Sequence, residues 1–139
     1  MHATRPRITY TVTAMSGGSL IIVDDDVTTA IALKYQLGDR GFRVLGTARS
    51  PADAEEMVRS KQPDFVLTDV LFGTNHEDSG ITLARKLRRF FSGRIVFMTG
   101  LSDGETLDEW QQIPNSELLR KPFRIAELVA RLSGARSVG

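Results

Sequence analysis

The chain alternates between short apolar runs and stretches in which apolar residues recur at helical spacing. Five apolar runs predict buried strands, at residues 20–23, 42–48, 63–71, 94–98 and 118–120. Four stripes with helical spacing are the sets Ala30, Leu33 and Leu37; Ala54, Met57 and Val58; Leu83, Ala84, Leu87 and Phe91; and Ile125, Leu128, Val129 and Leu132. With a further helix at roughly 102–112, strand and helix alternate five times.

Polar residues support the helix boundaries. Ser50 and Pro51 are typical of an N-cap followed by a first-turn proline, and Asp53 adds an acidic residue in the first turn. Asp26 is expected to cap the helix that follows the first strand, and Gly38 to Gly41 to end that helix. The regular pattern therefore begins and stops where the local chemistry predicts.

The alternation predicts an α/β fold, in which a parallel sheet joined by right-handed crossovers is covered by helices on both faces. In the flavodoxin-like strand order 2-1-3-4-5, the first and third strands lie beside the point where the order reverses. Ligands of such sheets bind beyond the carboxyl ends of the strands at that point. The residues that follow strands one and three are therefore the first candidates for a functional site.

The pattern divides the chain into three parts. Residues 1–19 are expected to form an extension that ends in Ser16-Gly17-Gly18-Ser19, a composition typical of flexible linkers. Within it, apolar and polar residues alternate at 8–13, as in a short strand. Residues 20–133 carry the whole strand and helix pattern, and residues 134–139 form a short tail. We expect one domain, with no DNA-binding or enzymatic output domain in this chain.

Composition narrows the class of protein. The 139 residues are 41% hydrophobic, and 18 basic against 17 acidic residues leave a net charge of +1. That balance gives no reason to expect nucleic acid or an anionic membrane as partner. The chain has no cysteine, no membrane-length apolar run and no signal peptide core, so a cytoplasmic protein is expected.

Functional side chains follow the predicted strands. Asp24, Asp25 and Asp26 follow the first strand, Asp69 the third, Thr99 the fourth and Lys121 the fifth. Carboxylates brought close together repel, and an all-oxygen site of this kind suits Mg²⁺. A hydroxyl and an ammonium beside that ion would complete a cradle for a phosphoryl group, with Asp69 as the nucleophile. Catalysis of this kind needs only position and charge.

These residues resemble the receiver domains of two-component response regulators over residues 20 to about 133. The resemblance rests on the acidic pair Asp24-Asp25, on Asp69, on Thr99 and on Lys121-Pro122-Phe123, in this order. It implies a flavodoxin-like (βα)5 fold and Mg²⁺ held by Asp25, Asp69 and the Leu71 carbonyl, with Asp24 acting largely through water. It also implies phosphoryl transfer to Asp69 from a sensor histidine kinase or His phosphotransfer protein, followed by slow self-dephosphorylation. No activity on external substrates is expected, and the signal would pass by contact with a downstream protein.

The chain departs from the family at two places. The loop after Asp69, residues 72–80, is longer than usual and lacks the common proline. Leu118 stands where many receivers carry an aromatic switch residue. Both departures leave open how phosphorylation would change the surface. A homodimer is possible, as in many receivers, but nothing in the sequence selects one.

Three other interpretations stay open beside this one. The chain could be a pseudo-receiver that binds partners without phosphorylation, or a receiver excised from a hybrid histidine kinase. A phosphatase or phosphotransferase would need a second Asp two residues after the nucleophile, where Leu71 stands.

The basic residues at 85, 86, 88 and 89 are expected to form a solvated helix face, and Trp110 to pack in the core or contact a partner. His2 and His76 lie in the extension and a loop, so the phosphodonor is expected in another molecule.

Overall fold

A computed structural model describes residues 17–71, 79–100 and 108–133. The expectations for the stretch at 8–13, for His2 and His76, for most of the loop at 72–80 and for the first part of the helix at 102–112 lie outside these residues.

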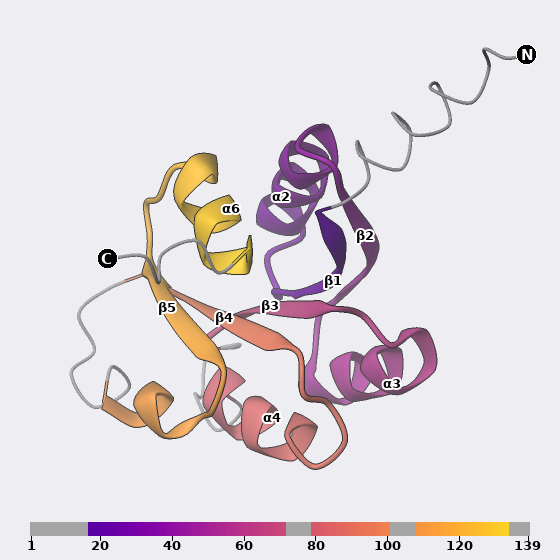
Figure 1. Cartoon of the computed structure of the whole chain (residues 1–139), viewed down its shortest axis with the longest axis vertical. Coiled ribbons are helices and arrows are strands. Elements are labelled where there is room, and N and C mark those ends of the chain that lie inside the picture. The colour runs from indigo at the N-terminus through magenta and orange to yellow at the C-terminus, as the bar shows by residue number, and fades with distance from the viewer. Residues whose placement is uncertain (1–16, 72–78, 101–107, 134–139) are drawn as a thin grey trace, which may run out of the picture.

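Five parallel strands form one sheet. They are β1 (Gly18–Val23), β2 (Phe42–Ala48), β3 (Phe65–Asp69), β4 (Arg94–Thr99) and β5 (Ser116–Arg120). Their order across the sheet is β2-β1-β3-β4-β5 (Figure 1). The predicted 2-1-3-4-5 order is confirmed.

Helices cover both faces of this sheet. The described helices are α2 (Val27–Asp39), α3 (Pro51–Lys61), α4 (Gly80–Leu87) and α6 (Ile125–Ser133), with a short 3-10 helix η1 (Trp110–Gln112) before β5. α2 and α6 pack on one face, and α3 and α4 pack on the other (Figure 1). No helix in the described ranges combines the length and apolarity that crossing a bilayer requires.

The interior strand β1 is apolar without interruption because helices cover it on both faces. Ile21 and Val23 belong to the cluster beneath α3 and α4, while Leu20 and Ile22 belong to the cluster beneath α2 and α6, and all four are fully buried. Burying one such side chain contributes roughly 1.5–3 kcal/mol. A strand covered on both faces therefore carries apolar residues at successive positions.

Two of the predicted helix starts are confirmed. The Asp26 carboxylate accepts hydrogen bonds from the backbone N–H of Thr28 at 3.0 Å and from the Thr29 hydroxyl at 2.8 Å, so it caps α2. Ser50 accepts from the Asp53 N–H at 3.2 Å and caps α3, with Pro51 in the first turn. Each cap fixes the direction in which its helix leaves the preceding segment.

The linker assignment was wrong at its end, because β1 begins at Gly18. Ser19 is 5% exposed, and its backbone N–H and hydroxyl both donate to Asp64 Oδ2, at 2.9 and 3.2 Å. A Ser that would be flexible in a linker is thus held here by a partner far along the chain. Two other boundaries also differ from the prediction: β5 begins at Ser116, and α4 ends at Leu87, while Phe91 is still buried from the turn that follows.

Candidate metal centre

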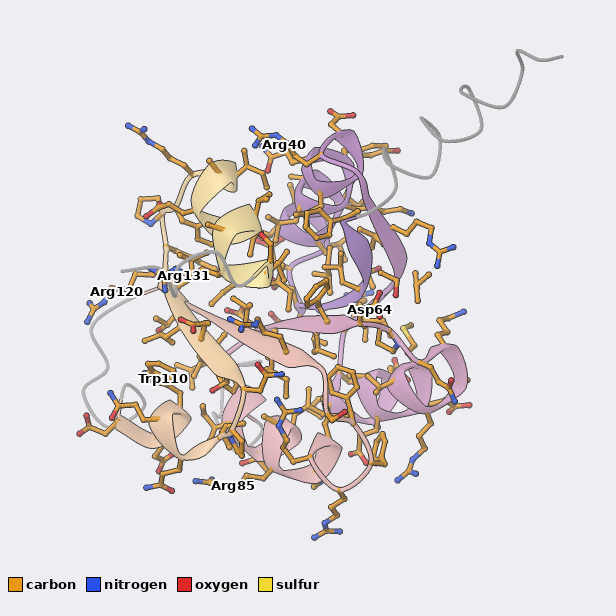
Figure 2. The ribbon with its side chains drawn as sticks, viewed as in Figure 1. Arg40, Asp64, Arg85, Trp110, Arg120 and Arg131 are labelled. Atoms are coloured by element: carbon orange, nitrogen blue, oxygen red, sulfur yellow. The ribbon has the colours of Figure 1, made fainter. Side chains whose placement is uncertain are left out.

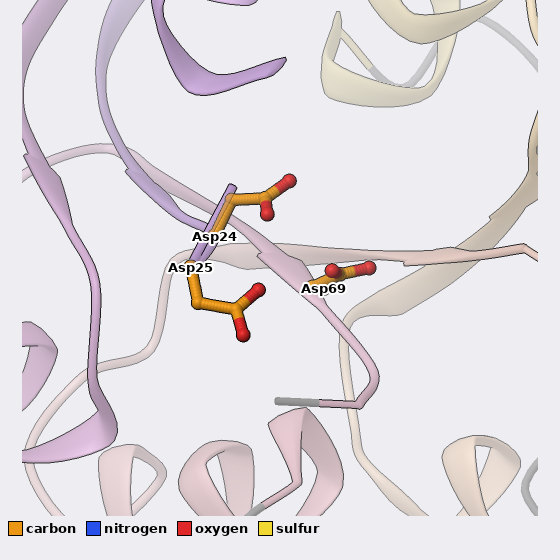
Figure 3. Close-up of side chains that lie close together, drawn as sticks. All are labelled: Asp24, Asp25 and Asp69. Carbon is orange, nitrogen blue, oxygen red and sulfur yellow. The ribbon is translucent and has the colours of Figure 1, made fainter. Parts of the chain in front are cut away.

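Three carboxylates gather at the carboxyl ends of β1 and β3. Val23 pairs with Thr68 in the parallel register, so Asp24 and Asp69 follow at adjacent positions of neighbouring strands. One ligand oxygen from each of Asp24, Asp25 and Asp69 lies within 4.8 Å of the others (Figure 3). The topology therefore brings together residues far apart in the sequence, as the strand order predicted.

Asp24 is the buried member of this group. Its side chain is 1% exposed, and its backbone N–H donates to the Ala48 carbonyl at 2.9 Å. Oδ1 accepts from the Asp26 N–H at 2.9 Å, whereas Oδ2 is buried without a hydrogen-bond partner among the described residues. A buried carboxylate oxygen left without a partner costs free energy, which a bound cation would recover. The donor set consists of oxygens and suits a hard divalent cation such as Mg²⁺.

Asp69 lies at the end of β3 with its side chain 16% exposed. Burial, and after it the charge of Asp24, raises the pKa of this carboxyl from 3.8 to about 6, against the opposing effect of Lys121. Burial also raises the pKa of Asp24, while its hydrogen bond from the Asp26 N–H and the charge of Lys121 lower it. The site therefore holds more negative charge than its burial favours, and positive charge is needed to balance it.

Lys121 supplies part of that positive charge. Its Nζ lies 3.3 Å from Asp69 Oδ1, and its backbone N–H donates to the Thr99 carbonyl at 2.8 Å. The Lys121-Pro122 peptide bond is cis. Thr99 ends β4 and is 4% exposed, and Asp69 pairs with the residue before it, Met98. The fourth and fifth strands thus deliver a hydroxyl and an ammonium to the edge of the sheet where the carboxylates lie.

The backbone beyond Asp69 is held closely. Leu71 forms an antiparallel bridge with Ser79, and the Gly80 N–H donates to the Val70 carbonyl at 2.7 Å. A Cβ atom at Gly80 would overlap the Asp69 carbonyl oxygen and come within 3.2 Å of Thr68 Oγ1. Gly80 is therefore needed for α4 to begin against the end of β3. The sequence marked it only as a loop boundary, because the close approach depends on the fold.

The remaining candidates fall in other roles. Asp26 caps α2, and its hydrogen bonds from Thr29 and Thr28 lower the pKa of its exposed carboxyl. Leu118 and Trp110 are both partly buried against the cluster beneath α3 and α4. Arg88, predicted to be on a solvated face, instead donates to the carbonyls of Phe91, Pro114 and Asn115 at 2.7–3.1 Å, so that prediction was wrong for this residue.

Comparison with known proteins shows the family to which this chain belongs. The family model of the response regulator receiver domain matches residues 20–133. The phosphate regulon transcriptional regulatory protein PhoB of Pseudomonas aeruginosa is 30% identical over 122 residues, covering 85% of this chain and 51% of that protein. The transcriptional regulatory protein YvrH of Bacillus subtilis is 29% identical over 119 residues, covering 85% and 48%. The chain thus spans about half the length of the curated relatives it matches.

Solved structures show the same architecture. The signal receiver domain of a modulated diguanylate cyclase from Desulfovibrio desulfuricans superposes with a TM-score of 0.76 at 25% identity, over 87% of this chain and 94% of that one. The BeF3-activated N-terminal receiver domain of Klebsiella pneumoniae RstA gives a TM-score of 0.73 at 28% identity, over 83% and 95%. The flavodoxin-like receiver fold expected from the sequence is therefore confirmed.

Proposed function

Because this chain belongs to the response regulator receiver domain family of two-component systems, we propose that it is a phosphorylatable receiver with Asp69 as its phosphoacceptor. The observation that supports this most strongly is the convergence of Asp24, Asp25 and Asp69, with Lys121 Nζ 3.3 Å from Asp69. Such a set of charges fits a phosphoryl group, which needs cations around its oxygens and an ionised carboxylate as nucleophile.

The proposed donor is the phosphohistidine of a sensor histidine kinase or a His phosphotransfer protein. A carboxylate oxygen of Asp69 attacks phosphorus, a P–O bond forms, and the P–N bond to the imidazole breaks. The imidazole nitrogen leaves with the bond's electron pair and then takes up a proton. The product is an acyl phosphate on Asp69, which water hydrolyses to restore the carboxylate and release inorganic phosphate.

The residues of the site divide this work. Asp24, Asp25, Asp69 and the Leu71 carbonyl would hold Mg²⁺, with Asp24 acting largely through water. The ion would neutralise carboxylate and phosphoryl charge when bound. Lys121 pairs with the carboxylate before transfer and with a phosphoryl oxygen afterwards. The Thr99 hydroxyl donates to another phosphoryl oxygen. A downstream protein then reads the changed surface.

Beryllofluoride tests this proposal because it mimics a phosphoryl group on a carboxylate. Urea unfolding would be measured with and without Mg²⁺ plus beryllofluoride. At a hundred times its dissociation constant, a ligand adds about 2.7 kcal/mol to the free energy of unfolding. The wild-type protein and Asp39→Asn, an exposed carboxylate of α2, are expected to show this gain, and Asp69→Asn is expected to show none.

A phosphorylation-independent interaction module is the second candidate, favoured by Leu118 at the position of the usual aromatic switch residue. That candidate predicts no stabilisation by beryllofluoride in any variant. An equal gain in Asp69→Asn would contradict Asp69 as the acceptor and move the search to another carboxylate.

A further inference from the structure

A hollow of about 520 Å³ lies at the opposite end of the sheet from the carboxylates. Its wall includes Val58 and Arg59 of α3, Asp64 just before β3, and Phe90 and Phe91 after α4. β3 runs from this end to Asp69, so the hollow and the acidic site lie at opposite ends of the same strand. The volume falls within the range of roughly 300–1,000 Å³ typical of ligand sites.

Arg59 offers a cation whose hydrogen-bonding edge is unused. Its guanidinium carbon lies 3.9 Å from the centroid of the Phe90 ring. Among the described residues, the Arg59 side chain makes no hydrogen bond or ion pair besides this stack. Stacking holds the guanidinium plane in one orientation and leaves its N–H groups free for a carboxylate.

Phe90 gives this site an apolar surface. It is 37% exposed, and it is one of four large hydrophobic side chains exposed among the described residues; the other three lie together on α2. Phe91, the next residue, is buried behind it at 8% exposure. A partner can therefore contact an aromatic ring and a cation at one place.

The segment around the hollow is strongly basic. Residues 79–93 contain Arg85, Lys86, Arg88 and Arg89 and no acidic residue. Arg88 is turned inward to backbone carbonyls, but the other three are exposed, and Arg85 lies on the outer side of α4 (Figure 2). Lys86 forms a surface ion pair with Glu55, with Nζ 4.0 Å from Oε2, which offsets part of its charge. This local excess of positive charge favours an anionic partner.

Acidic residues near the hollow decide where an anion can bind. Asp64 lines the hollow and carries a negative charge, but its Oδ2 faces Ser19, from which it accepts two hydrogen bonds. Glu55 and Glu56 line a separate hollow of about 480 Å³, which also borders Arg59. An anion paired with Arg59 is therefore favoured on the Phe90 side, away from Glu55 and Glu56.

We propose that this hollow binds an acidic segment of a partner protein. A carboxylate of the segment pairs with the Arg59 N–H groups, and an apolar side chain of the segment packs on Phe90 inside the hollow. Lys86 and Arg89 attract the flanking acidic residues, whereas Arg85 donates to Gln112 of η1. The interaction needs no phosphorylation of Asp69 and goes beyond the proposed function.

The test uses a fluorescein-labelled pentapeptide with one phenylalanine between two pairs of acidic residues, and its binding to the full chain is followed by fluorescence anisotropy. Phe90→Ala, which truncates the aromatic anchor, and Arg59→Glu, which reverses the paired charge, are each expected to weaken binding about tenfold or more. Lys34→Glu, a matched charge reversal on the exposed face of α2, is expected to leave binding unchanged. Added salt is expected to weaken it.

Asp69→Asn separates this proposal from the proposed function, because it is expected to bind the peptide as the wild-type protein does. A urea midpoint for each variant checks that it is folded, and Arg59→Lys, which keeps the charge but loses the planar fork, is expected to bind with intermediate affinity. Absence of binding at about 1 mM peptide would overturn the proposal, since that limit leaves less than about 4 kcal/mol of affinity. Equal binding by wild-type protein and Arg59→Glu would overturn it as well.

Discussion

Among the described residues, Asp69 is the carboxyl whose pKa is raised furthest in the folded protein without metal. Its pKa of about 6 lies above the ordinary value of 3.8. The folded state therefore favours the protonated carboxyl, and the contribution of Asp69 to stability is greatest below pH 4. That contribution is lost as pH rises through about 6.

Asp69→Asn is accordingly expected to stabilise the metal-free protein at neutral pH. The gain should be near zero at pH 4 and reach about 2–3 kcal/mol at pH 7, at 1.36 kcal/mol for each unit of pKa shift. Urea unfolding in the presence of a chelator across this range measures it. A gain that did not change with pH would show that folding does not raise the pKa of Asp69.

Gly80 holds the start of α4 against the end of β3, and a side chain there has no space beside the Asp69 carbonyl. Gly80→Ala is expected to lower the free energy of unfolding by about 1–3 kcal/mol, as overpacking of a close contact does. Gly38→Ala is the matched control, because nothing lies within 4 Å of a Cβ at that position. Equal losses in both variants would remove the steric explanation.

At this scale the sequence predicts residues that follow strands and misses residues that depend on close approach. Asp24, Asp25, Asp69 and Lys121 could be found because each stands at the end of an apolar run. Gly80, and the hydrogen bonds from Ser19 to Asp64, could not, since their partners are set by how β1, β3 and α4 meet. Local pattern carries no information about those distances.

Among the elements, α4 is tied to the turn before β5 through one arginine. Arg88 Nε and a terminal guanidinium nitrogen donate to the Pro114 carbonyl at 3.0 and 2.7 Å, and burial lowers the pKa of this guanidinium. The connection fixes η1 and the beginning of the edge strand β5 relative to α4. It explains why this member of a basic run is not solvated.

Arg88→Lys is expected to destabilise the protein by about 1.5–3 kcal/mol, since one ammonium cannot replace the forked donors to several carbonyls. Arg89→Lys, at the exposed neighbouring position, is expected to change stability by less than about 0.5 kcal/mol. Thermal or urea unfolding of the two variants compares them directly. Similar effects of the two substitutions would contradict the bracing role of Arg88.

Element boundaries illustrate the limit of periodicity. The apolar spacing of Leu83, Leu87 and Phe91 extended α4 to Phe91, but the helix ends at Leu87 and a turn buries Phe91 instead. A buried side chain keeps its apolar character whether a helix or a turn positions it. Hydrophobic pattern therefore finds the core residues more reliably than the last turn of a helix.

For the whole molecule, the five-fold alternation predicted a parallel sheet covered on both faces, and the resemblance to receiver domains implied its flavodoxin-like strand order. Parallel strands joined by right-handed crossovers leave few arrangements, and the β2-β1-β3-β4-β5 order places the ends of β1 and β3 together. The two ends of the sheet differ in chemistry. The acidic site lies at one end, and the stack of Arg59 on Phe90 lies at the other. The fold can therefore present two chemically different surfaces at once.

Asp69 as the phosphoacceptor is tested most directly by phosphorylating the full chain with acetyl phosphate and Mg²⁺, followed by mass spectrometry of the intact protein and its peptides. One added phosphoryl group is expected, located on Asp69, labile to hydroxylamine and absent when Mg²⁺ is chelated. Asp69→Asn should remain unlabelled, while Asp39→Asn should label like the wild-type protein. Undiminished labelling of Asp69→Asn, or no labelling of the folded wild-type protein, would show that Asp69 is not the phosphoacceptor.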